Sequence, residues 1–148
     1  MVCVVGRMRD LILQLSKSSI YSTKPILIRR CVLLSCYEET VSFYENLIAQ
    51  KARLRFDYPE YDLKLAQVGS VLLIGGTEKS LAPFRATEAT FLVNDISAWE
   101  KHLPSTGATI INPVKIVPTG WNMLVQHPDG MIAEYVEHHD KNPADEIF

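Results

Sequence analysis

The feature that most constrains the fold is a duplicated order of predicted elements. Residues 25–76 and 87–138 each have the pattern of a β-strand, an amphipathic helix and three further strands. Arg29 and Glu88 both stand a few residues before a helix start, and roughly 59 residues separate them. This spacing is longer than the repeats of solenoid proteins. We therefore predict one α+β domain built from two βαβββ modules.

The first module begins with a β-type run that gives way to a helix start. Ser35 and Glu38 have the spacing of a capping box, which predicts a helix from Ser35. Val41 and Tyr44 continue into an apolar stripe with helical spacing, so this helix should dock on a sheet. Short breaks containing Pro or Gly then separate three predicted strands, at residues 52–58, 61–68 and 71–75.

The second module follows a polar stretch, residues 76–87, that we interpret as a linker. Asn94 and Asp95 supply an N-cap for its helix. The module closes with a hairpin around the turn HPDG at residues 127–130, in which Pro, Asp and Gly each favour a turn position.

One carboxylate in the last strand raises a question of function. Ile132, Glu134 and Val136 share a face by the period of two along a strand. Burying an unpaired carboxylate among apolar side chains costs several kcal/mol, roughly. Glu134 should therefore lie beside a cation, a metal or water.

Composition narrows the class of partner and the compartment. The net charge of −2 and the absence of a basic stripe argue against nucleic acid and anionic membranes as partners. Three cysteines without CxxC spacing argue against a disulfide framework and a structural zinc site, and favour the cytoplasm. Residues 1–24 are interpreted as an N-terminal arm with a possible short amphipathic helix, too briefly apolar to span a membrane. Residues 139–148 form an acidic tail.

The segments FYENLI, AWEKHLPSTGATI and HPDGMIAEYVE, within the duplicated modules, resemble the vicinal oxygen chelate superfamily. This superfamily includes glyoxalase I, fosfomycin and bleomycin resistance proteins, and extradiol dioxygenases. The resemblance covers about residues 25–138. It implies a paired half-barrel, of the glyoxalase, bleomycin resistance and dihydroxybiphenyl dioxygenase type, whose sheets enclose a small-molecule cleft. Half-open sheets leave edges to cover, so we also expect a homodimer.

The resemblance also implies positions for a metal site. Metal-dependent members commonly take ligands from the first strand of each module, often His, and from a Glu in the last strand. These positions carry Arg29, Glu88 and Glu134 here. An Arg side chain cannot ligate a metal cation, so the imidazole-containing sites for Fe, Ni or Zn are absent from this sequence. Two carboxylates with water could still hold Mg or Mn. Alternatively, the Arg29 guanidinium replaces the metal's charge, either as a structural partner or as a binder of ligand anions.

The sequence thus predicts a small-molecule cleft with a degraded metal site and leaves two functions open. One is a metal-dependent lyase, isomerase or dioxygenase, with Glu134 and Glu88 as ligands or as acid and base. The other is a metal-free protein that sequesters a ligand, with Arg29, Trp121 and Phe56 as binding residues.

Overall fold

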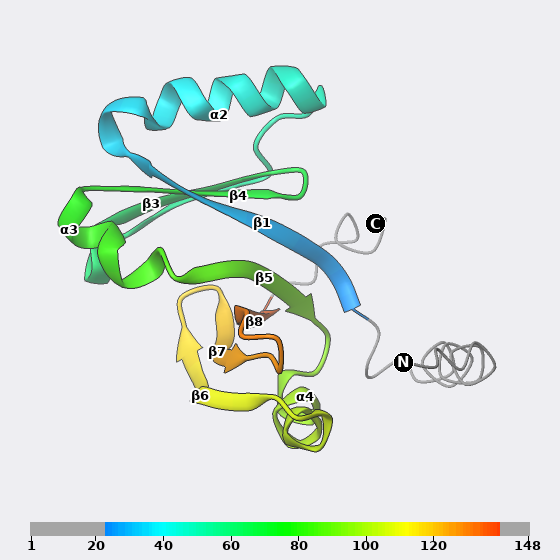
Figure 1. Cartoon of the computed structure of the whole chain (residues 1–148). Helices are drawn as coiled ribbons and strands as arrows, with labels where there is room; N and C mark the ends of the chain where they lie inside the picture. The colour runs from blue at the N-terminus through cyan, green and yellow to red at the C-terminus, as the bar shows by residue number, and fades with distance from the viewer. Residues whose placement is uncertain (1–22, 140–148) are drawn as a thin grey trace, which may run out of the picture.

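The computed structural model describes residues 23–139, which form one curled eight-stranded sheet with helices on its outer side (Figure 1). The predicted N-terminal arm and acidic tail lie almost wholly outside these residues. The predicted α+β half-barrel fold is confirmed. In chain order the strands are β1 (Thr23–Leu33), β2 (Leu54–Tyr58), β3 (Leu63–Val68), β4 (Val71–Gly76), β5 (Thr87–Val93), β6 (Thr109–Val117), β7 (Gly120–Gln126) and β8 (Ile132–His138).

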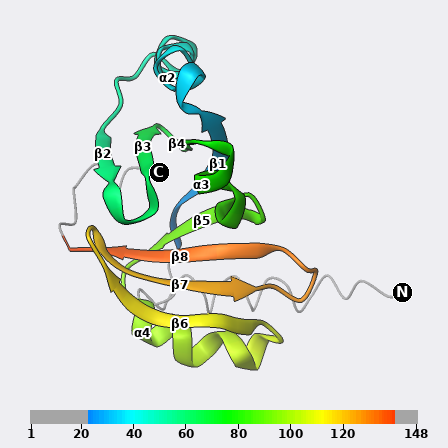
Figure 2. The same cartoon turned by 90° about the vertical axis from the view of Figure 1, so that its left-hand side faces the viewer.

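Two helices cover the two halves of the sheet. Figure 2 shows α2 (Leu34–Ile48) and α4 (Ile96–His102) at opposite ends of the molecule, each beside the strands of its own module. The predicted linker contains a short helix, α3 (Glu78–Leu81), which opens with a capping box between Thr77 and Ser80. No helix among residues 23–139 is long and apolar enough to cross a membrane.

The sheet order β2-β3-β4-β1-β5-β8-β7-β6 brings the first and last strands of both modules to its centre. Within each module the first strand pairs with the last in parallel, and β1 joins β5 in antiparallel fashion. Arg29 consequently pairs with Leu72 of β4, while Thr90 of β5 pairs with both Leu27 and Glu134. Residues far apart in sequence therefore meet on the four central strands.

Helices α2 and α4 begin differently. Helix α2 begins at Leu34 directly after β1, and Leu33 makes no side-chain capping bond, so the predicted capping box at Ser35 is wrong. Pairing of Leu33 with Gly76 extends β1 up to the helix, which leaves no residue free to act as a conventional cap. Helix α4 is capped as predicted, because the Asp95 carboxylate accepts a hydrogen bond of 3.0 Å from the Ala98 amide.

The core is divided into three clusters by the sheet and its helices. One cluster packs beneath α2 and includes Val41 and Leu73, and another packs beside α4 and includes Met123 and Val125. The third contains Leu27, Leu72, Ile74, Leu92 and Val136 from the central strands. This third cluster forms the apolar part of the inner face and positions the candidate site.

Gly120 allows the last hairpin to close tightly. Its φ of 151° is unfavourable for other residues, and a Cβ there would lie 1.9 Å from the Glu137 carbonyl oxygen on β8. The backbones of β7 and β8 can approach this closely only because position 120 has no side chain.

Candidate functional site

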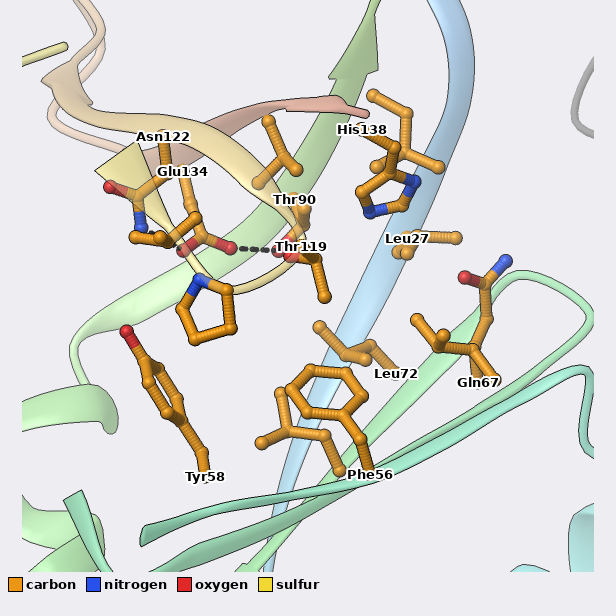
Figure 3. Close-up of a pocket in the computed structure, with 16 residues that line it drawn as sticks. Leu27, Phe56, Tyr58, Gln67, Leu72, Thr90, Thr119, Asn122, Glu134 and His138 are labelled. Atoms are coloured by element: carbon orange, nitrogen blue, oxygen red, sulfur yellow. Dashed lines mark hydrogen bonds between the residues drawn. The ribbon is translucent and has the colours of Figure 1, made fainter. Parts of the chain in front are cut away.

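A cleft of about 80 Å³ opens on the inner face of the sheet, between the two modules (Figure 3). Side chains from both modules line it, and most of them are apolar. Its hydrocarbon walls include Leu27, Leu54, Phe56, Leu65, Leu72 and Leu92. Such a surface favours a ligand with an apolar body, because its burial removes hydrocarbon from water.

The cleft has a polar end built around Glu134. Arg29 Nη1 donates to Glu134 Oε1 at 3.1 Å and to Thr90 Oγ1 at 3.0 Å. The Thr90 hydroxyl donates to the same Oε1 at 3.1 Å, and Asn122 Nδ2 donates to Oε2 at 3.0 Å. The Arg29 side chain is 6% exposed and that of Glu134 is 23% exposed. The carboxylate that the sequence places in an apolar row therefore has a cation and two neutral donors as partners.

Two buried polar atoms at this end have no hydrogen-bond partner within the described residues. They are Arg29 Nε and Asn122 Oδ1. An ionised carboxylate can only accept, so Glu134 requires the Asn122 amide to present its nitrogen. That orientation leaves the Asn122 oxygen as a buried, unused acceptor that points away from Glu134 (Figure 3).

Tyr58 stands at the same end, on β2, and remains a protonated phenol at neutral pH. Its burial raises the pKa of the phenol, and the Tyr61 hydroxyl and the carboxylates of Glu60 and Glu134 raise it further. Figure 3 shows the Tyr58 side chain across the cleft from Leu72, with its oxygen on the side of Asn122.

The structure brings two of the predicted site residues together and separates the third. Arg29 and Glu134 form the ion pair that the guanidinium hypothesis expected. Glu88 is exposed, lies at a register shift in β5 and does not line the cleft. The position next to Glu134 is occupied by Thr90, two residues further along the chain.

The two predicted aromatic binding residues also differ in placement. Phe56 lies in the cleft wall. Trp121 packs against the core cluster beside α4, with its ring centroid 4.5 Å from that of His139, and does not line the cleft. Asn122 takes the inward position because successive side chains of β7 point to opposite faces.

The sequence analysis did not predict several residues that line the cleft. Thr90, Asn122 and Gln67 are polar residues within strands, and this is the signal that could have identified them. Gln67 is buried and its Nε2 donates to the Gly69 carbonyl oxygen at 3.1 Å. Figure 3 places its side chain away from Glu134, so the cleft has polar groups at both ends.

The residues at the centre of the sheet do not fit a divalent metal of the vicinal oxygen chelate type. The four central strands present an alkyl group, a cation, a hydroxyl and one carboxylate there, from Leu72, Arg29, Thr90 and Glu134 respectively. A guanidinium repels a metal ion and cannot ligate it. Within residues 23–139, no three His, Cys, Asp or Glu side chains form a group that could hold a metal.

A different pair of side chains lies on the outer side, near the tip of the β7–β8 hairpin. His127 Nε2 is 2.8 Å from the Tyr135 hydroxyl, and the ring of Phe91 stacks on that of Tyr135. Burial raises the pKa of Tyr135 to about 12. Tyr135 belongs to the core beside α4, and neither residue of the pair lines the cleft.

No protein-family model matches the chain, and a comparison with curated proteins finds no match either. Among solved structures it is similar to an uncharacterized, hypothetical protein from Methanosarcina mazei. The two share 40% sequence identity with a TM-score of 0.74, over 82% of this chain and 97% of that one. The chain belongs to the same family as this Methanosarcina protein.

More distant solved structures share the fold of this family. Methylmalonyl-CoA epimerase from Mycobacterium tuberculosis is 15% identical, with a TM-score of 0.61 over 83% of this chain and 91% of that one. A Streptomyces coelicolor epimerase variant, in complex with 2-nitronate-propionyl-CoA, is 17% identical, with a TM-score of 0.56 over 82% and 100%. These likenesses show a shared fold, which is the fold that the predicted resemblance implies.

Proposed function

We propose that the protein binds a small, mainly apolar molecule in the cleft without a metal. One observation carries the proposal: Arg29 Nη1 lies 3.1 Å from Glu134 Oε1 at the polar end of an apolar cleft. Arg29 supplies the positive charge that Glu134 needs, at the centre of the sheet where metal-dependent members of the vicinal oxygen chelate superfamily would hold a cation. The function is then that of a sequestering or carrier protein.

Binding is favoured over acid–base catalysis because the carboxylate is already held by the protein's own donors. Three hydrogen bonds reach Glu134, and one of them comes from a cation. Taking up a proton would break the charge-assisted bond to Arg29. The enzyme alternative also required Glu88 as a second group, and Glu88 is exposed away from the cleft lining. We retain the cytoplasm as the proposed compartment, which agrees with free thiols at Cys31 and Cys36.

A fragment screen by NMR on ¹⁵N-labelled protein tests the binding function. We expect some compounds to shift resonances of cleft residues in the wild type. Leu65→Trp should abolish these shifts by filling the cleft, because Leu65 lines it. Leu47→Trp is the matched control, since Leu47 is exposed on α2. If the same fragments bind Leu65→Trp unchanged, the cleft is not the binding site.

Metal analysis tests the claim that no metal is needed. The protein is purified without added metal or chelator, then incubated separately with Mg, Mn, Fe, Ni and Zn, and its metal content is measured. We expect no stoichiometric metal. A stoichiometric metal that is lost in Glu134→Ala would contradict the proposal and restore the metal-dependent alternative.

We further propose that two copies associate through the outer face of β1. Ile26 and Ile28 are 49% and 59% exposed there, and they lie beside each other on one face of the strand by the period of two. Two copies related by a twofold axis can each cover the exposed Ile26 and Ile28 of the other. Sedimentation should show a dimer for the wild type and a monomer for Ile28→Lys. A monomeric wild type would refute this interface.

A further inference from the structure

We infer that the cleft selects uncharged ligands that donate a hydrogen bond, such as primary amides, over carboxylates of the same shape. The inference rests on the proposed binding function and specifies the chemical class of ligand.

The apolar walls set the size of the group that enters. A volume of about 80 Å³ is small beside the roughly 300–1,000 Å³ of pockets that hold drug-sized ligands. A compact branched group of a few heavy atoms therefore fits between Leu27, Leu72 and Leu92. Any larger part of a ligand must remain at the mouth of the cleft.

The polar end presents one acceptor, on Glu134, to that group. Glu134 Oε2 has a single hydrogen bond, from Asn122 Nδ2, and therefore has room for another donor. Asn122 Oδ1 has no partner in the described part of the chain. A primary amide can supply an N–H donor to Glu134 Oε2, whereas the buried Asn122 Oδ1 is out of its reach.

The charges at this end disfavour an anionic ligand. The Arg29 side chain is almost fully buried, does not line the cleft, and directs Nη1 to Glu134 and Thr90. The positive charge of Arg29 therefore lies on the side of Glu134 that is away from the cleft. The more exposed carboxylate of Glu134 lines the cleft itself. An incoming carboxylate would meet a like charge in a partly desolvated site. Lys115 Nζ lies 6.0 Å from the Tyr61 ring centroid and is not part of the lining.

Three small molecules of one shape test this selectivity. Isobutyramide, isobutyrate and methyl isopropyl ketone share an isopropyl carbonyl group and differ only in an amino group, an oxygen anion or a methyl. Each is titrated into ¹⁵N-labelled protein while the side-chain amide resonances of Asn122 are followed. We expect the dissociation constant of isobutyrate to exceed that of isobutyramide at least tenfold, with the ketone between them.

Glu134→Gln should reverse this order. The variant removes the negative charge that faces the cleft and leaves Arg29 without its counter-ion, so isobutyrate should become the tightest ligand. Asn122→Leu provides a second variant should Glu134→Gln fail to fold. It removes the hydrogen bond that Glu134 Oε2 receives, so isobutyramide should bind the variant several-fold more tightly than it binds the wild type, while isobutyrate should not gain.

The outcomes separate this inference from the proposed function. Isobutyrate binding the wild type as tightly as isobutyramide overturns the selectivity and leaves cleft binding standing. The same holds if none of the three binds while other fragments do so in the cleft. If no molecule enters the cleft in either experiment, both the inference and the proposed function fail.

Discussion

Replacing Arg29 by Met tests the ion pair at the centre of the sheet most directly. The substitution keeps much of the buried alkyl chain and leaves the Glu134 carboxylate without its cation. Removing one partner of a buried pair costs about 3–5 kcal/mol. Glu134 is 23% exposed and keeps its bonds from Thr90 and Asn122. We therefore expect a loss at or somewhat below the lower end of this range, about 2–3 kcal/mol.

Urea denaturation, followed by the fluorescence of Trp99 and Trp121, measures this loss. With a denaturant dependence of about 1.5–2 kcal/mol per molar, the midpoint should fall by more than about 1 M. Arg85→Met is the matched control, because Arg85 pairs with Glu78 at 3.3 Å on the surface. Such exposed pairs contribute about 0–1 kcal/mol.

A double variant shows whether the loss comes from an unpaired charge. Arg29→Met combined with Glu134→Met removes both charges and should recover most of the stability, because apolar replacement of a buried pair is often neutral. If Arg29→Met costs no more than Arg85→Met, Arg29 does not neutralise a buried carboxylate. The structural basis of the proposed function would then be lost.

Three further predictions concern stability. Burial raises the pKa of Tyr135 to about 12 from 10.0, so the stability linked to its phenol is complete below pH 10 and is lost as the pH rises towards 12. Tyr135→Phe should remove up to about 3 kcal/mol of this alkaline loss, and identical pH profiles of urea stability for variant and wild type would contradict it. Gly120→Ala should cost several kcal/mol, roughly, because its Cβ would collide with the β8 backbone, whereas Gly130→Ala, with open space around it, should cost about 1 kcal/mol. Equal urea midpoints for these two variants would refute the close approach. Asp95→Ala should lower stability by about 1 kcal/mol through loss of the α4 cap, and an unchanged midpoint would show that the cap is dispensable.

Much of the fold could be predicted because its signals are local. The alternation around Glu134 and the cap at Asp95 each depend on a few neighbouring residues, and the structure shows both. The start of α2 was mispredicted because Ser35 satisfies a local capping pattern, whereas pairing of Leu33 with Gly76 extends the preceding strand. A partner 43 positions away in the chain thus overrode a local preference.

The candidate site, too, was predicted where the signal is local and mispredicted where pairing between distant strands decides the position. The sequence identified Glu134 as a carboxylate that needs a partner, and it identified Arg29 as a candidate for that partner. It placed Glu88 beside them, whereas the register shift in β5 puts Thr90 there. Strict alternation cannot predict such a shift, because the pairing partners of a strand determine where it occurs.

By itself the sequence determined the two modules, their helices and the apolar faces of their strands, because hydrophobic periodicity acts over short distances along the chain. Only the tertiary structure decided which polar side chains meet in the cleft. Arg29 lies 61 positions from Thr90 and 105 from Glu134, and β1, β5 and β8 bring the three together. Hydrogen-bonded pairing of whole strands sets that proximity, and a shift of one residue would turn each side chain to the opposite face.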